Sequence, residues 1–133
     1  ELMVRAEHGC VNCVPLLSLI SAEKRALKDK SGDAALYRQA IAMLGRSGFR
    51  LFKAIACERA GEYMLECNVT QGSHEYLQQA WNEFNDYGAL AKLCQMREKY
   101  HGIYTFSECF RLESRSSGKL KAHNLEKWNQ DVR

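Results

Sequence analysis

Proline is almost absent from this chain, and long apolar runs are missing altogether. The only proline is Pro15, so most of the sequence is free to form helix. No run approaches the roughly 18 consecutive apolar residues that mark a membrane-spanning helix. We therefore expect a helical protein without membrane insertion.

Motifs for nucleotide chemistry are missing as well. The sequence contains neither the G-x-x-x-x-G-K-[ST] phosphate loop nor G-x-G-x-x-G, and it lacks the kinase motifs H-R-D and D-F-G. None of the four histidines is paired in sequence with an obvious nucleophile. His74 follows Ser73, whose hydroxyl we expect to cap a helix N-terminus. The sequence therefore predicts no catalytic residue, no cofactor and no enzymatic activity in this chain.

The net charge is small, at +3 from 19 basic and 16 acidic residues. Proteins that bind nucleic acid or membrane surfaces usually concentrate basic residues on one face. We therefore expect a protein partner and no nucleic acid. The chain also lacks a basic segment followed by an apolar core and a small-residue cleavage site, so we expect a cytoplasmic protein.

Six cysteines require a choice between disulfides and thiols. Without a secretion signal, reduced thiols in the cytosol are the favoured interpretation. Cys57, Cys67 and Cys94 lie on or beside apolar faces of predicted helices. A free cysteine in such a place behaves as a small hydrophobic residue.

The sequence has one group with the spacing of metal ligands, formed by His8, Cys10 and Cys13. Two thiolates in C-x-x-C can reach the same zinc ion, but a structural site needs four ligands and there is no second such pair. A redox pair of the thioredoxin type would need a βαβ context, and we expect no strands here. We therefore predict no metal, and a small metal-binding helical protein stays an alternative.

A group of three carboxylates lies at helical spacing. Glu58, Glu62 and Glu66 stand at i, i+4 and i+8, so they project from one side of a helix. Paired carboxylates can serve acid–base chemistry or a di-iron centre, but the di-iron pattern also needs Glu-x-x-His motifs, which are missing. We expect a solvated acidic stripe.

The stretch from 49 to 100 has the clearest helical pattern. It predicts three buried helical faces with apolar residues at i, i+3, i+4 and i+7. The faces are Phe52, Ile55, Ala56, Arg59, Ala60, Tyr63, Met64 and Cys67, then Leu77, Ala80, Trp81, Phe84 and Tyr87, then Leu90, Leu93, Cys94, Arg97 and Tyr100. Upstream, Asn12 is the expected N-cap of a helix that ends near Lys28. Asp33 is the expected N-cap of the next helix, which Gly48 ends.

Two of these helices are related by an internal repeat of 40 residues. The segment 37–41 can be laid over 77–81, and a glycine follows each at the same distance. The paired positions are Gln39 and Gln79, Ala40 and Ala80, and Gly48 and Gly88. Two helices per period of this length are typical of an α-solenoid.

The chain is expected to have three parts. Residues 1–12 form a lead or the end of a preceding helix, and 13–100 form a helical-repeat domain of about five helices. Residues 101–133 form a less regular, partly flexible tail with a weak helical pattern at 119–130. We expect Tyr63 and Tyr76 to face a bound peptide, because exposed residues on the concave face of a solenoid bind partners.

Three segments match a known kind of helical region. They are 34–41 with 47–49, then 54–63, and most specifically 76–81 with 87–93, where Tyr87-Gly88-Ala89-Leu90-Ala91-Lys92 carries an aromatic-Gly-Ala-x-Ala-Lys motif. Through these residues the run from Leu16 to Tyr100 resembles the tetratricopeptide-like region of very large multidomain sensor kinases. In those proteins a serine/threonine-kinase-like domain and an AAA-type ATPase module precede the region, and a GAF domain and a histidine kinase follow it.

The matching residues are structural, so the resemblance implies no catalytic residue in this chain. The chain departs from the pattern at Asp33, where a small alanine often packs, and at Gly61, where glycine interrupts a helix. The segment after Tyr100 also does not resemble the start of a GAF domain.

These observations predict an all-α, tetratricopeptide-like α-solenoid of antiparallel helix pairs. The expected function is a non-catalytic interaction or spacer segment of a larger signal-transduction kinase. A free-standing helical adaptor that binds a peptide or helix of a partner protein is the first alternative. The metal-binding protein that uses His8, Cys10 and Cys13 is the second.

Overall fold

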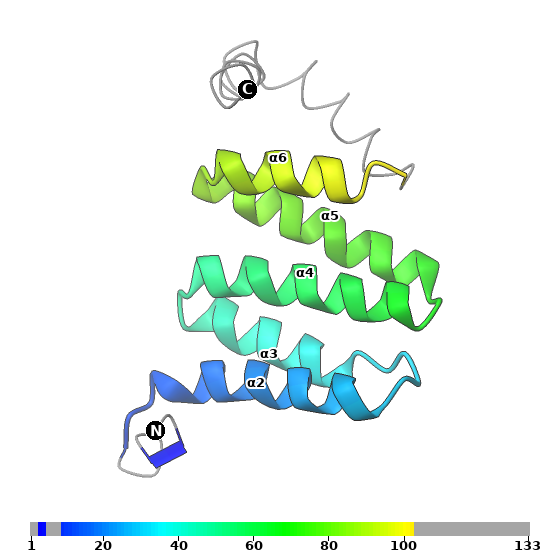
Figure 1. Ribbon diagram of the computed structural model, residues 1–133. Coiled ribbons are helices and arrows are strands. Elements are labelled where there is room, and N and C mark those ends of the chain that lie inside the picture. Colours follow the sequence, from blue (N-terminus) through cyan, green and yellow to red (C-terminus); the bar gives the residue numbers. More distant parts are fainter. Residues whose placement is uncertain (1–2, 5–8, 103–133) are drawn as a thin grey trace. The chain divides into compact units, whose positions relative to one another are not determined.

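The computed structural model describes residues 3–4 and 9–102. Within these residues the chain is all-α and contains no strand, which confirms the predicted class (Figure 1). The helices are α2 (Cys13–Lys28), α3 (Ala35–Arg46), α4 (Arg50–Glu66), α5 (Thr70–Tyr87) and α6 (Leu90–Lys99). Most of the lead, the tail from 103 onward and the helix expected at 119–130 lie outside the described residues.

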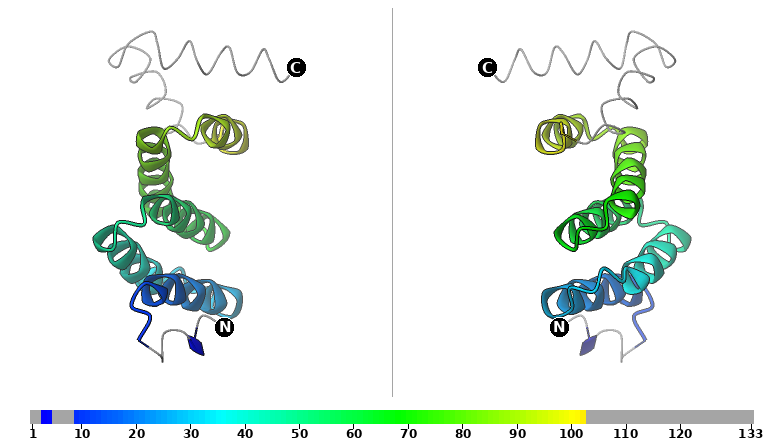
Figure 2. Two further views of the ribbon diagram at one scale, coloured as in Figure 1. Left: turned by 90° about the vertical axis from the view of Figure 1, so that its left-hand side faces the viewer. Right: turned by 90° about the vertical axis from the view of Figure 1, so that its right-hand side faces the viewer.

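The chain divides into two compact units, Glu1–Glu83 and Phe84–Arg133, and the boundary falls within α5. In the first unit consecutive helices run antiparallel, and α3 packs against both α2 and α4. The views along the helices show α3 to one side of α2 and α4, which also contact each other (Figure 2). The core between these helices includes Ala22, Tyr37, Ala40, Ile41, Leu44, Ala56 and Ala60.

Helix α4 is buried on nearly every side because it has neighbours on both of its flanks. Its buried residues are mostly small, namely Ala54, Ala56, Cys57, Glu58, Ala60, Gly61 and Tyr63. Gly61, an unfavourable residue for a helix interior, lies close to Leu77 of α5. A Cβ at Gly61 would lie 2.7 Å from Cγ of Leu77, closer than two carbon atoms can pack. Glycine at this position lowers the helix propensity of α4, but it allows α4 and α5 to pack closely.

Three helices end in the same turn, at positions spaced 20 residues apart. The residues with positive φ are Gly48 (75°), Asn68 (62°) and Gly88 (83°). In each turn the next residue donates its N–H to a carbonyl five residues back, from Phe49 to Leu44 (3.0 Å), from Val69 to Met64 (2.8 Å) and from Ala89 to Phe84 (3.0 Å). This is the Schellman hydrogen bond, which needs a left-handed residue at its centre.

The 40-residue repeat is therefore present in the local backbone geometry. The helices that follow Gly48 and Gly88 begin at Arg50 and Leu90, again 40 residues apart. Ala40 and Ala80 are both fully buried, as expected for the small residue of each unit. The matched sequence positions have matched structural roles.

The connection from α2 to α3 is built from side chains rather than from a Schellman turn. Asp29 accepts a hydrogen bond from the Ser31 N–H (2.9 Å), and Asp33 accepts one from the Ala35 N–H (3.0 Å). The bond from Ser31 is the main cause that lowers the pKa of Asp29 below its ordinary value. Asp33 thus stands one residue before the N-cap, which is Ala34.

Several residues lie elsewhere than their sequence pattern predicts. Phe52 is 40% exposed and contacts the ring of Phe49 edge-on at a centroid distance of 6.3 Å. Tyr87 is 55% exposed because it stands at the last turn of α5, beside the end of its helix. Ser73 lies inside α5, where its hydroxyl donates to the Thr70 carbonyl (2.6 Å) instead of capping the helix.

The second unit contains several buried residues on and beside α6. Leu93, Cys94, Met96 and Tyr100 are buried, as is Phe84 from the end of α5. The ammonium of Lys92 lies 5.6 Å from the centre of the Phe84 ring, within range of a cation–π contact.

Candidate functional site

A groove of about 820 Å³ lies in the first unit between α3, α4 and α5. This volume is within the range of pockets that bind small molecules or peptide side chains. Its lining residues are Gly32, Asp33, Ala34, Arg38, Ile41, Ala42, Gly45, Arg46, Lys53, Met64, Gly72, Glu75, Tyr76 and Gln79. The groove is therefore lined by an apolar surface with charged groups around it.

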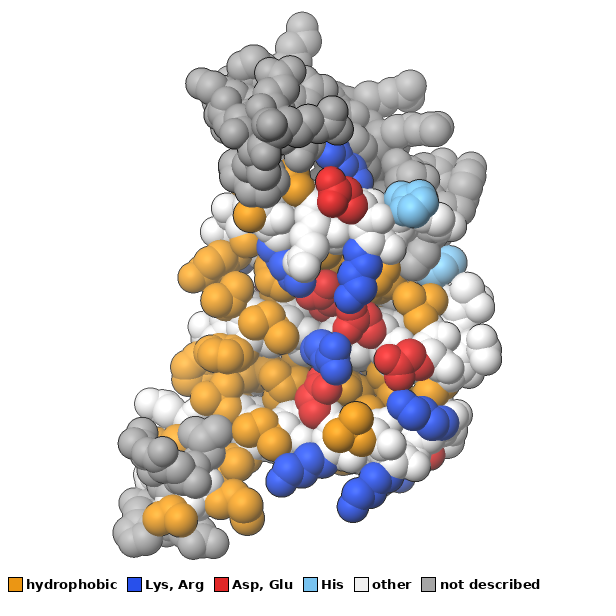
Figure 3. Space-filling view, viewed as in Figure 1, with side chains coloured by type: hydrophobic (Ala, Val, Ile, Leu, Met, Phe, Trp, Pro, Cys, Tyr) orange, Lys and Arg blue, Asp and Glu red, His pale blue; other side chains and the backbone are white. Residues whose placement is uncertain are grey.

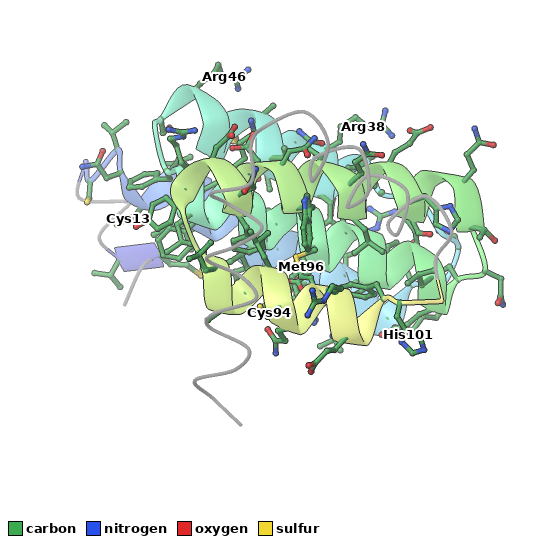
Figure 4. All side chains as sticks on the ribbon, turned by 90° about the horizontal axis from the view of Figure 1, so that it is seen from above. Cys13, Arg38, Arg46, Cys94, Met96 and His101 are labelled. Atoms are coloured by element: carbon green, nitrogen blue, oxygen red, sulfur yellow. The ribbon has the colours of Figure 1, made fainter. Side chains whose placement is uncertain are left out.

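Two arginines of α3 border this groove. Arg38 and Arg46 are exposed, and eight residues of helix place them about 12 Å apart on the same side. Figure 4 shows both side chains extending from that side of α3. Among the described residues neither guanidinium has an acidic partner. Two guanidinium groups without an acidic partner in this part of the chain suit a ligand with two anionic groups.

The other charged groups around the groove are mostly engaged. Lys53 forms an ion pair with Glu83, and both side chains are largely buried. The Asp33 carboxylate accepts the N–H of Ala35 at the start of α3. Glu75 of α5 is exposed, so one carboxylate stands at the opposite border from the arginines. The two arginines of α3 are therefore the basic groups of the groove without an acidic partner among the described residues, and Asp33 and Glu75 are acidic groups at its border.

The groove has an apolar lining because α3 and α5 present small residues there. Ala42 and Gly45 of α3 leave room beside Ile41. On α5, Gly72 makes room for Met64, whose methyl group lies 2.4 Å from the position that a Cβ would take. Methionine adapts its shape readily to a bound apolar side chain.

Tyr63 and Tyr76, the residues expected to face a peptide, have different surroundings. Tyr76 is partly exposed and lines the groove. Tyr63 is only 5% exposed, and its hydroxyl donates to the Asp29 carbonyl (3.0 Å) and accepts the Gly32 N–H (3.2 Å). Tyr63 thus links α4 to the α2–α3 connection, and only Tyr76 is placed to contact a ligand.

The acidic stripe of α4 is solvated only at Glu66, whose side chain is 64% exposed. Glu58 is buried, Glu62 accepts a hydrogen bond from Arg59 (2.7 Å), and Glu66 pairs with Lys30 (3.1 Å). Glu62 pairs within its own helix, whereas the partner of Glu66 lies in the α2–α3 connection, 36 residues away in the sequence.

Arg59 is at the centre of this charged face. Its Nε and Nη2 donate to the two oxygens of Glu23 on α2, each at 2.9 Å. This bidentate bond is the main cause that raises the pKa of Arg59. Figure 3 shows acidic and basic side chains beside one another over α2 and α4. We call Glu23, Lys30, Arg59, Glu62 and Glu66 the paired-charge face.

The predicted metal group is only partly described. Cys10 and Cys13 lie together, with 3.2 Å between their sulfur atoms, whereas His8 lies outside the described residues. Over the described residues, no three His, Cys, Asp or Glu side chains gather as metal ligands would. Cys57 is fully buried, and burial raises the pKa of its thiol to about 12.

Comparison with known proteins adds no family. No protein-family model, curated protein or solved structure matches this chain. Among the described helices, none is both long enough and apolar enough to cross a bilayer.

The arginines of the groove were missed in the sequence, although a signal for them exists. The positions four residues from Arg38 are Ala34 and Ala42, and those from Arg46 are Ala42 and Arg50. An arginine with no carboxylate at these positions has no partner on its own helix. The second half of the signal, the lack of a partner on a neighbouring helix, is visible only in the structure.

Proposed function

We propose that this chain is a non-catalytic, tetratricopeptide-like α-solenoid segment that binds an acidic segment of a partner protein in the groove of α3, α4 and α5. The observation that supports it best is that Arg38 and Arg46 lie beside an apolar lining and have no acidic partner within residues 3–4 and 9–102. The proposed partner segment is extended, with two carboxylates on one face and an apolar side chain between them.

The repeated turns support the solenoid part of the proposal. Helix ends at Gly48, Asn68 and Gly88 recur every 20 residues with the same hydrogen bond. A chain whose helices end at a constant interval tends to add each helix to the last in the same manner. The helices α3 and α4 form one such pair, and α5 and α6 have the matching turn.

The spacing of the arginines supports an extended ligand. In an extended peptide, residues i, i+2 and i+4 point to the same face and span about 13 Å. This length matches the separation of about 12 Å between Arg38 and Arg46. A peptide with the pattern Asp-x-Leu-x-Asp would place a carboxylate at each arginine and its leucine between them, beside Ala42 and Met64.

Binding of such a peptide is the direct test. A fluorescein-labelled Asp-x-Leu-x-Asp peptide is titrated with the full chain and followed by fluorescence anisotropy. Charge-assisted hydrogen bonds contribute about 1.5–3 kcal/mol each, so Arg38→Ala and Arg46→Ala should each weaken binding by about tenfold or more. The Asn-x-Leu-x-Asn and Asp-x-Ser-x-Asp peptides should also bind more weakly.

A matched control is available outside the groove. Arg50 is an exposed arginine at the start of α4 that does not line the groove, so Arg50→Ala should leave the affinity unchanged. Equal affinities of wild type, Arg38→Ala and Arg46→Ala would refute binding through these arginines. Absence of binding to every acidic peptide would favour the spacer role instead.

The resemblance supports a larger signalling kinase as the parent protein. An antibody raised against this chain should then detect a band far above 15.2 kDa in extracts of the source cells. A band near 15.2 kDa would instead support the free-standing adaptor. The peptide experiment applies equally to both, because the groove lies within the chain itself.

A further inference from the structure

Cys10 and Cys13 form a pair of thiols at the start of α2. The Cys13 N–H donates to the Cys10 carbonyl (3.0 Å), and this bond closes a four-residue turn. A turn of this kind brings its end Cα atoms within about 7 Å, and a disulfide needs about 4.4–6.8 Å. The two sulfur atoms already lie 3.2 Å apart.

The other described cysteines have no such neighbour. Cys57 and Cys94 are buried singly in α4 and α6, and burial raises the pKa of both thiols. Cys67 is partly exposed at the end of α4. The closeness of Cys10 and Cys13 therefore follows from the turn that precedes α2 and not from general crowding of cysteines.

We propose that Cys10 and Cys13 are a reversible redox site, which a low-molecular-weight disulfide oxidises to an intramolecular disulfide. The Cys10 thiolate attacks the small disulfide, forms a mixed disulfide and releases one thiolate. Cys13 then loses its proton, attacks the Cys10 sulfur and displaces the second thiolate. In total the two protein thiols are oxidised to one disulfide, and one small disulfide is reduced to two thiols.

The exposures of the two side chains assign these steps. Cys10 is partly exposed and can meet a small disulfide, whereas Cys13 is only 6% exposed. A buried second thiol cannot easily react with a bulky reagent, but it can reach the neighbouring sulfur at 3.2 Å. The resolving step should therefore outpace a second reaction with the external disulfide.

The disulfide would join the segment before α2 to the first residue of that helix. Cys13 is the first residue of α2, and Asn12 at the N-cap position makes no side-chain cap hydrogen bond. The helix start is held by the backbone bonds of the turn instead, including Val14 N–H to the Val11 carbonyl (3.3 Å). Oxidation would replace a turn that can open with a covalent ring.

The test equilibrates the full chain with reduced and oxidised glutathione at a series of ratios without oxygen. The samples are then quenched with acid, alkylated and digested with trypsin. The peptide 6–24 contains both Cys10 and Cys13 and no other cysteine. We expect this peptide to lose two hydrogens and both alkylation sites as the ratio becomes oxidising, and thioredoxin with its reductase should reverse the change.

Two variants make the result specific. Cys13→Ser should accumulate glutathione on Cys10, because the resolving thiol is gone, and Cys67→Ser should behave as wild type. Stable glutathione on Cys10 of the wild-type chain would overturn the proposal. So would a peptide 6–24 that keeps two free thiols at every ratio.

Discussion

Two charged surfaces of the first unit differ in how their charges are satisfied. On the paired-charge face, Arg59 binds Glu23 and Glu62, and Lys30 binds Glu66. At the groove, Arg38 and Arg46 have no acidic partner among the described residues. Both surfaces include residues of α4. The paired-charge face neutralises its own charges, whereas the groove has two cations that no described carboxylate neutralises.

The difference separates stability from binding. A guanidinium that is already bidentate to a carboxylate has few donors left for a ligand, so Arg59 belongs to the fold. Arg38 and Arg46 gain nothing for the fold from their charge, and they keep their donors for a partner. The sequence alone does not distinguish Arg59 from Arg38 and Arg46. The ion pairs of Arg59 in the structure do distinguish them.

The largest expected effect comes from the buried core of the first unit. Trp81 is 2% exposed, so Trp81→Ala should lower the free energy of unfolding by about 3–5 kcal/mol. Both surfaces should be lost together, because a marginally stable domain does not survive such a change. Urea unfolding followed by circular dichroism measures the effect. A loss below about 1 kcal/mol would contradict the burial of Trp81.

The pH dependence of stability tests whether the Cys57 thiol is shielded from water in the folded state. Burial raises the pKa of Cys57 to about 12, against an ordinary thiol value of 9.0. The neutral thiol therefore favours the folded state below pH 9, and this contribution is lost as the pH rises from 9 toward 12. At about pH 10 the wild type should lose roughly 1.4 kcal/mol relative to its value at about pH 8.

The Cys57→Ala variant has no thiol at this position, so it should not show this loss of unfolding free energy at high pH. The difference between the two proteins isolates Cys57, because every other titrating group is common to both. Urea unfolding under reducing conditions at the two pH values measures it. The same pH dependence in both proteins would mean that water reaches the Cys57 thiol in the folded state.

Removing the centre of the paired-charge face should have a smaller effect. Arg59→Met keeps the aliphatic stem and deletes the bonds to Glu23 and Glu62, for a loss of about 1 kcal/mol after allowance for solvent screening. A double-mutant cycle with Glu23→Gln should show coupling that weakens as salt is added. Additive effects of the two changes would contradict a stabilising role for the pair.

The smallest effect on stability is expected at the groove. Arg46→Met makes the same chemical change as Arg59→Met, but no ion pair is lost, so the free energy of unfolding should change by less than about 0.5 kcal/mol. Thermal unfolding of the two variants in parallel tests the contrast directly. If Arg46→Met destabilised the protein as much as Arg59→Met, the distinction between the two surfaces would be wrong.

Much of the local structure could be predicted from the sequence. The repeated Ala40 and Ala80 and the glycines at 48 and 88 indicate where the helices pack and end, because both depend on residue size and backbone freedom. Asn68 is the exception, since its positive φ was not predicted. Asparagine can adopt a positive φ, but it indicates this conformation less strongly than glycine does.

The roles of individual side chains were less predictable. Phe52 fits the apolar pattern of α4 but is 40% exposed, and Glu58 fits an acidic stripe but is buried. Tyr63 was expected at a peptide and instead closes the α2–α3 connection. The two partners of Tyr63 lie more than 30 residues away in the sequence, so the pattern of its own helix does not reveal them.

The all-α class and the helix ends at Gly48 and Gly88 could be predicted from the sequence, because they depend on apolar spacing and backbone freedom within a few residues. Only the tertiary structure decided which charges are paired, where the groove lies and why Gly61 is needed. These properties depend on the distance between side chains of different helices. Such distances between helices cannot be obtained from the spacing of residues along one sequence.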